Sequence, residues 1–288
     1  MRIFVTGNKG QLGRALYQAL SAQDNILSGC DLPELDITDR NAITVAIRDF
    51  APDVVIHAAA WTDVDGCARD PGRAYLVNAI GTQNVALACA ECDAVMLYVS
   101  TNEIFDGTAA EPYCEWDCPN PINPYARSKA AGEWFVSHLL TRFYITRTAW
   151  LYAVGGRNFS NPRRIIELAD ERGELKVVSD EVGNPTYAPD LAWAIARLVQ
   201  TGAYGIYHLV NSGYCSRYEY VCRVLQLAGR SHIPVTPISL SDFSRASTPP
   251  RFAPLANIAA AALGITLRPW QEAVEEFLTS TAGPAGAL

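Results

Sequence analysis

The sequence predicts an α/β protein with a doubly wound parallel sheet and a smaller C-terminal lobe. Apolar, β-prone runs alternate with amphipathic helical patterns five times before Trp150, which is typical of a parallel sheet covered by helices. A glycine-rich turn joins the first strand to the first helix. After Trp150 the alternation becomes less regular. We therefore expect one domain over 1–150 and a second lobe mainly over 151–288, with some later segments returning to the sheet.

Size and charge exclude several classes of protein. The 288 residues are 49% hydrophobic and 18% charged, which indicates a well-buried globular chain, and the net charge of −7 argues against nucleic acid as a partner. Ile3 to Val5 is too short for a signal or membrane segment, so we expect a cytoplasmic protein without membrane contact. The eight cysteines are then reduced thiols, and the scattered histidines predict no metal site.

The first strand is expected at 2–6, and a glycine-rich loop follows it. Gly7, Gly10 and Gly13 are spaced three apart, and an amphipathic helix runs on to about Ala22. Glycines let the backbone turn sharply and approach a pyrophosphate, whose charge lies at the helix N-terminus. A glycine pattern that follows a strand and opens a helix indicates a Rossmann-type dinucleotide-binding domain.

A second strand is expected at 25–30, and it ends in Asp31. An acid some twenty residues past such a loop commonly accepts hydrogen bonds from the adenosine ribose, although an ordinary turn aspartate is the alternative. Thr38 or Asp39 then caps a helix that ends at Phe50.

The third and fourth strands carry small and polar residues at their carboxyl ends. Residues 53–57 lead into three alanines, which would let a flat ligand lie close to the backbone. A long helix is expected at 74–92, followed by a strand at 95–99 that ends in Ser-Thr-Asn-Glu. Ligands of open parallel sheets lie outside the carboxyl ends of the strands, so Thr101 is placed to hydrogen-bond a substrate oxygen.

A long loop over 104–123 precedes a helix from Tyr125 to about Leu140. Tyr125 and Lys129 are four residues apart and share one helical face. A nearby ammonium favours the phenolate, so we expect the pKa of Tyr125 to be lowered and the phenol to act as a proton donor or acceptor.

The rest of the chain is expected to mix short strands and helices. Strands are predicted at 143–149, 176–178 and 206–210, and helices at 159–172, 191–200, 218–227 and 270–278. A Pro-rich stretch covers 234–254, and 279–288 is expected to fray. This C-terminal lobe would close a cleft over the carboxyl edge of the sheet.

Together these residues resemble the extended short-chain dehydrogenase/reductase superfamily and, within it, the dTDP-4-dehydrorhamnose reductase family. The likeness covers nearly the whole chain, and its segments are specific as a set. The segments that carry it are Thr6-Gly7, Gly10 to Gly13, Pro52 to Val55, Ala58 to Ala60, Thr62, Val64, Asp65, Ser100-Thr101, Phe105 to Gly107, Pro124-Tyr125, Lys129, Arg147-Thr148, Trp150, Asn158-Phe159, Gly183, Pro185-Thr186, Asp190 to Ala192, Gly205 and Tyr207 to Leu209.

The resemblance implies hydride transfer from NADPH or NADH to the C4 carbonyl of a dTDP-linked 6-deoxy-4-ketohexose. Tyr125 would protonate the nascent alkoxide, Lys129 would bind the nicotinamide ribose, and Thr101 would hydrogen-bond the carbonyl oxygen. The sugar would contact Thr101, Asn102, Glu103 and Trp150. The residues expected to line the cofactor are Gly7, Gly10, Gln11, Leu12, Gly13, Asp31, Asp36, Ile37, Ala60, Trp61, Thr62, Val99, Tyr125 and Lys129.

Three departures from the family pattern matter. Asn102-Glu103 stands where the family usually has Asp-Tyr, which puts the exact substrate in doubt. Arg14 stands where the family has an acid used in some members for magnesium, so no metal is carried over. The family's C-terminal Arg-Pro-x-Asn-Ser segment survives only roughly, around 250–254, and the nucleotide contact there is expected to differ.

Cofactor preference, partner and reaction stay open in part. Asp31 would favour NADH, whereas Lys9 would balance the 2′-phosphate of NADPH. The expected partner is a nucleotide sugar, with a homodimer as the candidate assembly. Two other functions fit the same frame: a nucleotide-sugar epimerase or dehydratase, with Glu103 as the base, and a non-catalytic regulatory subunit of a methionine adenosyltransferase.

Overall fold

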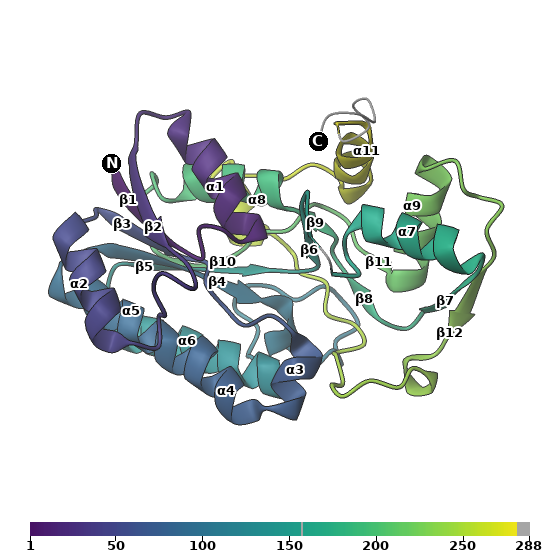
Figure 1. Cartoon of the computed structure of the whole chain (residues 1–288), viewed down its shortest axis with the longest axis horizontal. Coiled ribbons are helices and arrows are strands. Elements are labelled where there is room, and N and C mark those ends of the chain that lie inside the picture. The colour runs from purple at the N-terminus through teal and green to yellow at the C-terminus, as the bar shows by residue number, and fades with distance from the viewer. Residues whose placement is uncertain (157, 281–288) are drawn as a thin grey trace.

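A single parallel sheet forms the centre of the larger of two lobes (Figure 1). The structure, a computed structural model, describes residues 1–156 and 158–280. Six strands follow one another in the order β2-β1-β3-β4-β5-β10, and every neighbouring pair is parallel. The predicted doubly wound sheet is therefore confirmed. The strands are β1 Arg2–Thr6, β2 Ile26–Cys30, β3 Val54–His57, β4 Val95–Thr101, β5 Phe143–Thr148 and β10 Gly205–His208.

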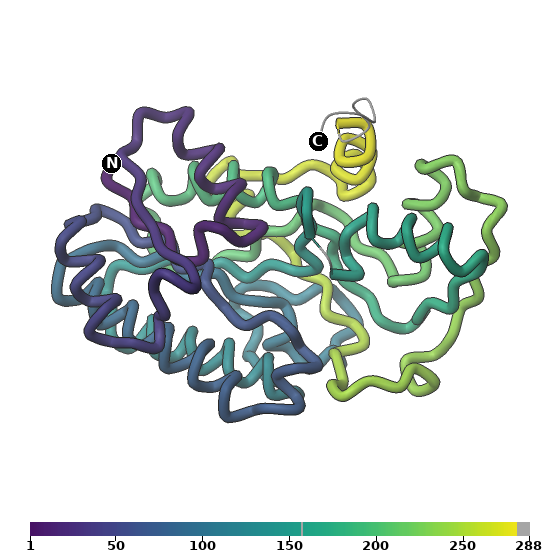
Figure 2. Tube along the Cα trace, in the orientation of Figure 1, coloured from purple at the N-terminus to yellow at the C-terminus, as the bar shows by residue number. Residues whose placement is uncertain are grey.

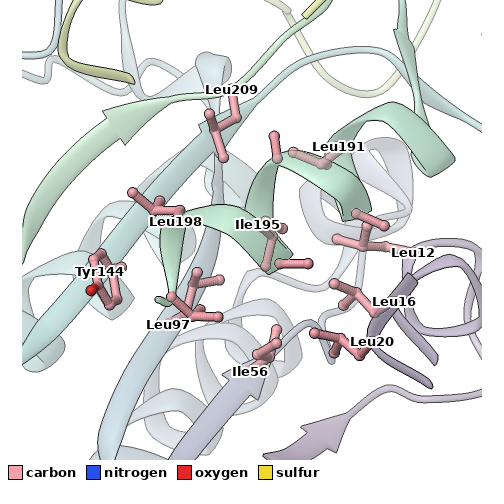
Figure 3. Packing of buried hydrophobic residues seen from close by; sticks show 14 of the residues in the cluster. Leu12, Leu16, Leu20, Ile56, Leu97, Tyr144, Leu191, Ile195, Leu198 and Leu209 are labelled. Carbon is pink, nitrogen blue, oxygen red and sulfur yellow. The ribbon is translucent and has the colours of Figure 1, made fainter. Parts of the chain in front are cut away.

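Helices cover both faces of this sheet because its strands are apolar on both sides. On one face α1 (Gln11–Ser21) packs against α8 (Ala188–Leu198), with leucines of both helices meeting Ile56 and Leu97 of the sheet (Figure 3). On the other face lie α2 (Arg40–Phe50), α5 (Gly81–Glu91) and α6 (Pro124–Leu139).

Segments from the C-terminal half return to this first lobe. The core cluster beneath α1 includes side chains of α8, of β10 and of α10 (Ile258–Ala262). Figure 2 shows the chain crossing between the lobes more than once along its length. The first lobe is thus completed only after residue 188, because α8 and β10 supply one edge and one covering layer of the sheet.

The second lobe is a small α/β assembly around its own core. Helices α7 (Pro162–Arg172), α9 (Arg217–Leu227) and α11 (Trp270–Ser280) pack around Tyr152, Tyr220 and Phe277. Three two-stranded ladders complete it, each built from short strands. They are β7 Leu175–Val178 with β12 Val235–Ile238, β8 Val182–Gly183 with β11 Cys215–Ser216, and β6 Leu151–Tyr152 with β9 Thr186–Tyr187.

Several predicted elements differ from the observed ones. The single helix expected at 74–92 is a run of α4 (Pro71–Tyr75), a π-helical turn η1 (Leu76–Ile80) and α5. The helix expected from residue 159 begins at Pro162, because Asn161 caps it. The strand predicted at 176–178 is β7, whereas the other strands of the short ladders, α10 and α3 (Val64–Arg69) were not predicted.

Two 3-10 turns also lie in segments that were predicted as loops. They are η2 Asn102–Ile104 and, inside the Pro-rich stretch, η3 Leu240–Asp242. The part of the predicted frayed tail beyond Ser280 lies outside the described residues.

A buried ion pair joins the sheet to the helix that carries Tyr125. The Arg147 guanidinium on β5 donates to both carboxylate oxygens of Glu133 on α6, at 2.8 to 3.3 Å, and the two side chains are 2% and 8% exposed. Arg147 Nη1 also donates to the Glu115 carbonyl, 3.2 Å away, in the long loop. Strand, helix and loop are therefore fixed to one another behind the carboxyl edge of the sheet.

Two absences hold for residues 1–156 and 158–280. No helix there is long and apolar enough to cross a membrane. No group of three or more His, Cys, Asp or Glu side chains there is placed to hold a metal ion. Arg14, the departure from the family pattern noted above, donates from its Nε to the Lys9 carbonyl at 2.7 Å.

Candidate active site

A cleft of about 750 Å³ separates the carboxyl edge of the sheet from the second lobe. It is lined by most of the residues that the sequence singled out. The predicted site residues along it are Gly7, Gly10, Gln11, Leu12, Gly13, Ala60, Thr62, Val99, Thr101, Asn102, Glu103, Tyr125, Lys129 and Trp150. The four that do not line it are Asp31, Asp36, Ile37 and Trp61.

The glycine loop forms one end of the cleft, and its glycines are required by close backbone approach. Gly7 has φ +71°, and a Cβ there would lie 2.7 Å from the Ala59 nitrogen. A Cβ on Gly13 would lie 2.1 Å from the Gly7 oxygen. Gly10 caps α1 without a side-chain hydrogen bond, so the first N–H groups of the helix remain for a ligand.

The donors and acceptors of this end fit a dinucleotide. Gln11 Oε1, Ser100 Oγ and Thr148 Oγ1 are buried polar atoms without a hydrogen-bond partner in the described chain, and all three residues line the cleft. Buried polar groups normally have partners, so these atoms indicate a polar ligand. A helix N-terminus with free N–H groups beside them suits a pyrophosphate.

Asp31 uses its carboxylate on the protein's own backbone. Oδ2 accepts from the Lys9 nitrogen at 3.0 Å and Oδ1 from the Leu32 nitrogen at 2.8 Å. The Lys9 ammonium pairs with Glu34 at 2.6 Å on the exposed surface. Asp31 therefore fixes the glycine loop, and both groups that were expected to choose between the two dinucleotides have protein partners.

Asp36, Ile37 and Trp61 have partners outside the cleft. The Asp36 carboxylate accepts from the Thr38 nitrogen at 2.9 Å, and Ile37 is buried in the core beneath the sheet. The Trp61 backbone is bonded on both sides by the Asn78 side chain. Asp36 is exposed, Trp61 is half-buried and Ile37 is a core residue, so none of the three forms the surface of the cleft in this structure.

Thr101, Tyr125 and Lys129 meet where β4 ends beside the first turn of α6. All three side chains are at least nine-tenths buried. Asn123 caps α6, accepting from the Ala126 nitrogen at 2.8 Å, and Pro124 fills the first helical position. Helix capping thus sets the angle at which Tyr125 enters the cleft.

The predicted lowering of the Tyr125 pKa is wrong for this structure. Burial raises the pKa well above its usual value, and the Glu103 charge raises it further, while a hydrogen bond with Thr101 opposes them. The Lys129 ammonium has other partners. Its Nζ donates to the Val99 carbonyl at 2.7 Å and lies 4.1 Å from the centre of the Tyr98 ring.

Lys129 itself is strongly perturbed. Burial lowers its pKa from 10.5 to about 7, and only the charge of Glu133 opposes this. His57 lies in the same layer, and burial together with the Lys129 charge lowers its pKa to about 3. Burial therefore disfavours the charged forms of both Lys129 and His57.

A polar network fixes this wall from behind. The Asn78 amide donates to the Trp61 carbonyl and to Ser128 Oγ, each at 3.0 Å, and Ser128 Oγ donates to the Tyr125 carbonyl at 2.7 Å. Asn78 belongs to the π-helical turn η1, which places its amide between β3's end and α6. Such turns often occur near functional sites.

Asn102 and Glu103 have different environments although they are adjacent. The Asn102 amide donates to the Ala253 carbonyl at 2.9 Å, and the residue is 4% exposed, so it ties β4's end to the C-terminal segment. Glu103 Oε2 accepts from Asn123 Nδ2 at 2.8 Å, and burial raises the pKa of the Glu103 carboxyl.

Trp150 forms the opposite wall of the cleft in an unusual backbone conformation. Its φ is +41°, which a non-glycine residue seldom adopts. A Cβ on Gly183 would lie 2.7 Å from the Trp150 indole, so glycine there is what admits the ring. The Arg217 guanidinium lies 3.5 Å from the centre of the indole.

The sequence reasoning missed several cleft residues of the second lobe. Arg217 Nε donates to Glu181 Oε1 at 2.9 Å and Nη1 to Ser160 Oγ at 3.0 Å. Arg245 pairs with Asp65 across one end of the cleft at 3.1 Å. These cations come from short or irregular segments, and no local sequence pattern marks them.

Fold and site together define a Rossmann-type oxidoreductase with a dinucleotide end and a second, aromatic and cationic end. The chain matches the sequence model described as RmlD substrate binding domain over residues 1–282. It belongs to this family, which includes the dTDP-4-dehydrorhamnose reductases.

Named relatives of this kind match almost the full length of the chain. The dTDP-4-dehydrorhamnose reductase of Mycolicibacterium smegmatis is 35% identical over 98% of this chain and 86% of its own length. The crystal structure of the Clostridium acetobutylicum dTDP-4-dehydrorhamnose reductase has a TM-score of 0.93 and 36% identity, covering 98% of this chain and 100% of its own. That of Bacillus anthracis, in complex with NADP, has a TM-score of 0.92 and 36% identity, with 97% and 99% covered.

Proposed function

We propose that the protein reduces the C4 keto group of a dTDP-linked 6-deoxy-4-ketohexose with NADPH or NADH. The observation that carries this proposal is that Thr101, Tyr125 and Lys129 share one cleft with the glycine loop. Relatives at 35 to 36% identity bear the name dTDP-4-dehydrorhamnose reductase, and one of them binds NADP. Membership of this family supports a 4-keto nucleotide sugar as the substrate. The residues of the cleft support reduction of its keto group.

The reduced nicotinamide dinucleotide would lie along the glycine loop and supply the hydride. Gly10 and the start of α1 would hold its pyrophosphate, and Ala60, Thr62 and Val99 would border it. Lys129 would contact the nicotinamide ribose. Asp31 would act mainly through the glycine loop that it anchors.

Tyr125 is the proton donor. Its raised pKa keeps the phenol protonated at neutral pH, so it can give a proton to the oxygen on which negative charge develops. Thr101 stabilises the same oxygen by a preplaced hydrogen bond, and burial of both hydroxyls strengthens the effect because water is excluded.

The second lobe would bind the nucleotide sugar. Trp150 and Arg217, whose guanidinium stacks on the Trp150 ring, would border the hexose. Arg217, Arg245 and Lys176 line the cleft and give it positive charge suited to a diphosphate. On this basis we propose that residues 1–150 bind the dinucleotide and that residues 151–288 mainly bind the nucleotide sugar.

The direct test is a panel of 4-keto nucleotide sugars mixed with NADH or NADPH. We expect the absorbance of the reduced nicotinamide to fall only with a 4-keto sugar, one cofactor being oxidised per sugar reduced. Sugar conversion without net cofactor oxidation would instead identify an epimerase or dehydratase that recycles a tightly bound NAD⁺.

Replacement of the proton donor tests the residue assignment. Tyr125→Phe should lower turnover by roughly two powers of ten, the scale of general acid catalysis, and leave dinucleotide binding nearly unchanged. Tyr75→Phe, on an exposed tyrosine outside the cleft, is the matched control. Turnover of the Tyr125 variant within a few-fold of wild type would remove Tyr125 from this role.

Two further proposals concern setting and assembly. All eight cysteines are unpaired, which supports a reducing compartment such as the cytoplasm. A homodimer is the proposed assembly, and sedimentation of the purified chain tests it by its mass.

A further inference from the structure

The proposed reduction assigns no role to Glu103, an acidic residue of the cleft. A carbonyl reduction needs a single proton, which Tyr125 supplies, yet Glu103 also lines the cleft immediately after β4. Glu103 is half-buried, and holding a carboxylate largely out of water is unfavourable unless it has partners or a function. Glu103 has one hydrogen bond to its carboxylate, from Asn123 Nδ2 to Oε2 at 2.8 Å. Oε1 makes no hydrogen bond or ion pair within the described ranges of the chain.

Hydrogen bonds connect Glu103 to Thr101 and to the start of the helix that carries Tyr125, the two residues whose hydroxyls would bind the substrate carbonyl. Its backbone nitrogen donates to Thr101 Oγ1 at 3.2 Å. Asn123, which holds the Glu103 carboxylate, also caps α6 through the Ala126 nitrogen at 2.8 Å, one residue after Tyr125. These hydrogen bonds, one to Thr101 and the other through Asn123 to the start of α6, therefore fix the position of the Glu103 carboxylate relative to Thr101 and Tyr125.

The electrostatic surroundings of the Glu103 carboxylate suit a general base. Burial raises the pKa of Glu103, the Glu181 charge adds to this, and the Asn123 hydrogen bond with the charges of Arg245 and Arg217 limits it. A carboxylate with a raised pKa takes up a proton more readily than an exposed one. Its charge is also felt at Tyr125, whose pKa it raises, so the two groups lie within electrostatic reach.

We propose that Glu103 removes a proton from a carbon next to the keto group and returns it, so that the cleft enolises the keto sugar as well as reducing it. This inference rests on the proposed function, because it takes the same substrate. Thr101 and Tyr125, placed to stabilise negative charge on the carbonyl oxygen during reduction, stabilise the enolate in the same way.

The step balances without any oxidant or reductant. The C–H bond breaks, its proton moves to the Glu103 carboxylate, and its electron pair forms a carbon–carbon double bond. The carbonyl π pair moves to the oxygen. Reversal returns the proton from the Glu103 carboxyl to the same carbon and regenerates the keto sugar.

Deuterium exchange tests the proposal. The full-length protein is incubated in D₂O with NADP⁺ and dTDP-4-keto-6-deoxyglucose or dTDP-4-dehydrorhamnose, and the sugar is followed by mass spectrometry. NADP⁺ cannot reduce the keto group, so enolisation alone is read out. We expect the wild type to incorporate deuterium well above the enzyme-free rate. Reduction with NADPH is measured separately on the same sugars.

The decisive quantity is the ratio of the exchange rate to the reduction rate. Glu103→Gln keeps the side chain's volume and an oxygen that can accept from Asn123, but it removes the base. The ratio should fall by roughly 100-fold. Asp106→Asn is the control: Asp106 lies three residues further on, does not line the cleft and bonds Thr108, Tyr113 and Asn120. Its ratio should stay within about twofold.

Each other outcome is also decisive. Reduction without exchange in the wild type overturns the inference and leaves the proposed function standing. Equal loss of both rates in Glu103→Gln assigns Glu103 to positioning of Asn123 and α6 and overturns its role as a base. Exchange without reduction of either sugar overturns the proposed function but supports the inference.

Discussion

On the sheet side of the cleft, the groups proposed for chemistry stand on the ends of regular elements. Thr101 ends β4, Tyr125 opens α6, and both are more than nine-tenths buried. On the side of the second lobe, Trp150 has a positive φ in the turn between β5 and the two-residue strand β6, and Arg217 begins α9 after a two-residue strand. The sheet side is fixed by continuous secondary structure, whereas the lobe side is fixed by contacts between distant residues.

The ion pairs of the two regions differ in how far their side chains are exposed to solvent. Arg147 and Glu133, behind the sheet side, are 2% and 8% exposed, whereas Arg230 and Asp170 of the second lobe are 34% and 46% exposed. Arg217 and Glu181 in the cleft lie between them at 17% and 10%. Changes behind the sheet side should therefore act on stability, and changes on the lobe side should act on substrate binding.

The largest expected effect is on the buried pair. Arg147→Met should destabilise the fold by about 3–5 kcal/mol, because it leaves the Glu133 carboxylate buried without its partner. Chemical denaturation measures this. The double variant Arg147→Met with Glu133→Leu should recover most of the loss, since a buried pair can often be replaced by apolar groups at little cost.

Arg230→Met, on the exposed pair of the second lobe, is the matched comparison. Its effect on the denaturation midpoint should be much smaller, because exposed pairs contribute little. Similar destabilisation by the two substitutions would contradict the contrast between the regions.

A pH-dependent effect of the next size is expected at Lys129. Its folded pKa of about 7 lies below its ordinary value of 10.5, so burial of the charged form opposes folding. This penalty is complete below pH 7, where both states are protonated. It shrinks as pH rises from 7 to 10.5, because only the unfolded chain then keeps the proton. Lys129→Met should therefore gain stability relative to wild type most strongly at pH 6, by on the order of 3 kcal/mol.

Denaturation at pH 6 and pH 9 measures the Lys129 effect. The loss of the hydrogen bond to the Val99 carbonyl does not vary with pH, so the difference between the two pH values isolates the titration. Lys176→Met, on an exposed lysine, should show no such difference. A Lys129 variant whose relative stability is the same at both pH values would show that the lysine is not perturbed.

On the lobe side the expected effect is smaller and kinetic. Arg217→Lys keeps a positive charge beside Glu181 but loses the flat guanidinium over Trp150 and the second hydrogen-bonding arm to Ser160. We expect KM for the nucleotide sugar to rise about tenfold, which corresponds to about 1.4 kcal/mol, with kcat within about threefold. Arg230→Lys, outside the cleft, should leave both constants unchanged. A fall in kcat alone would place Arg217 with the reacting groups.

The smallest effect is expected at the glycine loop. Asp31→Ala removes the acceptor of the Lys9 N–H, so it should weaken NADH and NADPH together by about three- to fivefold, the scale of one hydrogen bond. Fluorescence titration with each dinucleotide measures this. A loss confined to NADH would return Asp31 to the ribose contact that its spacing predicts.

The sequence by itself determined the sheet, the glycine loop and the neighbourhood of Thr101 and Tyr125. These follow from local rules: strand and helix periodicity, the glycine spacing and the four-residue separation of Tyr125 and Lys129 on α6. The carboxyl ends of parallel strands meet at one edge, so residues that follow β1, β3 and β4 had to share the cleft.

Only the tertiary structure decided the burial, the contacts and the pKa shifts of those residues. The Tyr125 pKa is raised because burial and the Glu103 charge outweigh the hydrogen bond with Thr101, and the sequence does not show that burial. Asp31, Asp36, Ile37 and Trp61 have the right spacing yet bond or pack elsewhere. Arg217 reaches Trp150, and Glu103 shares a frame with Tyr125 through Asn123, because chain segments far apart in sequence fold together. Desolvation and long-range contact depend on all neighbours in space, which no local pattern records.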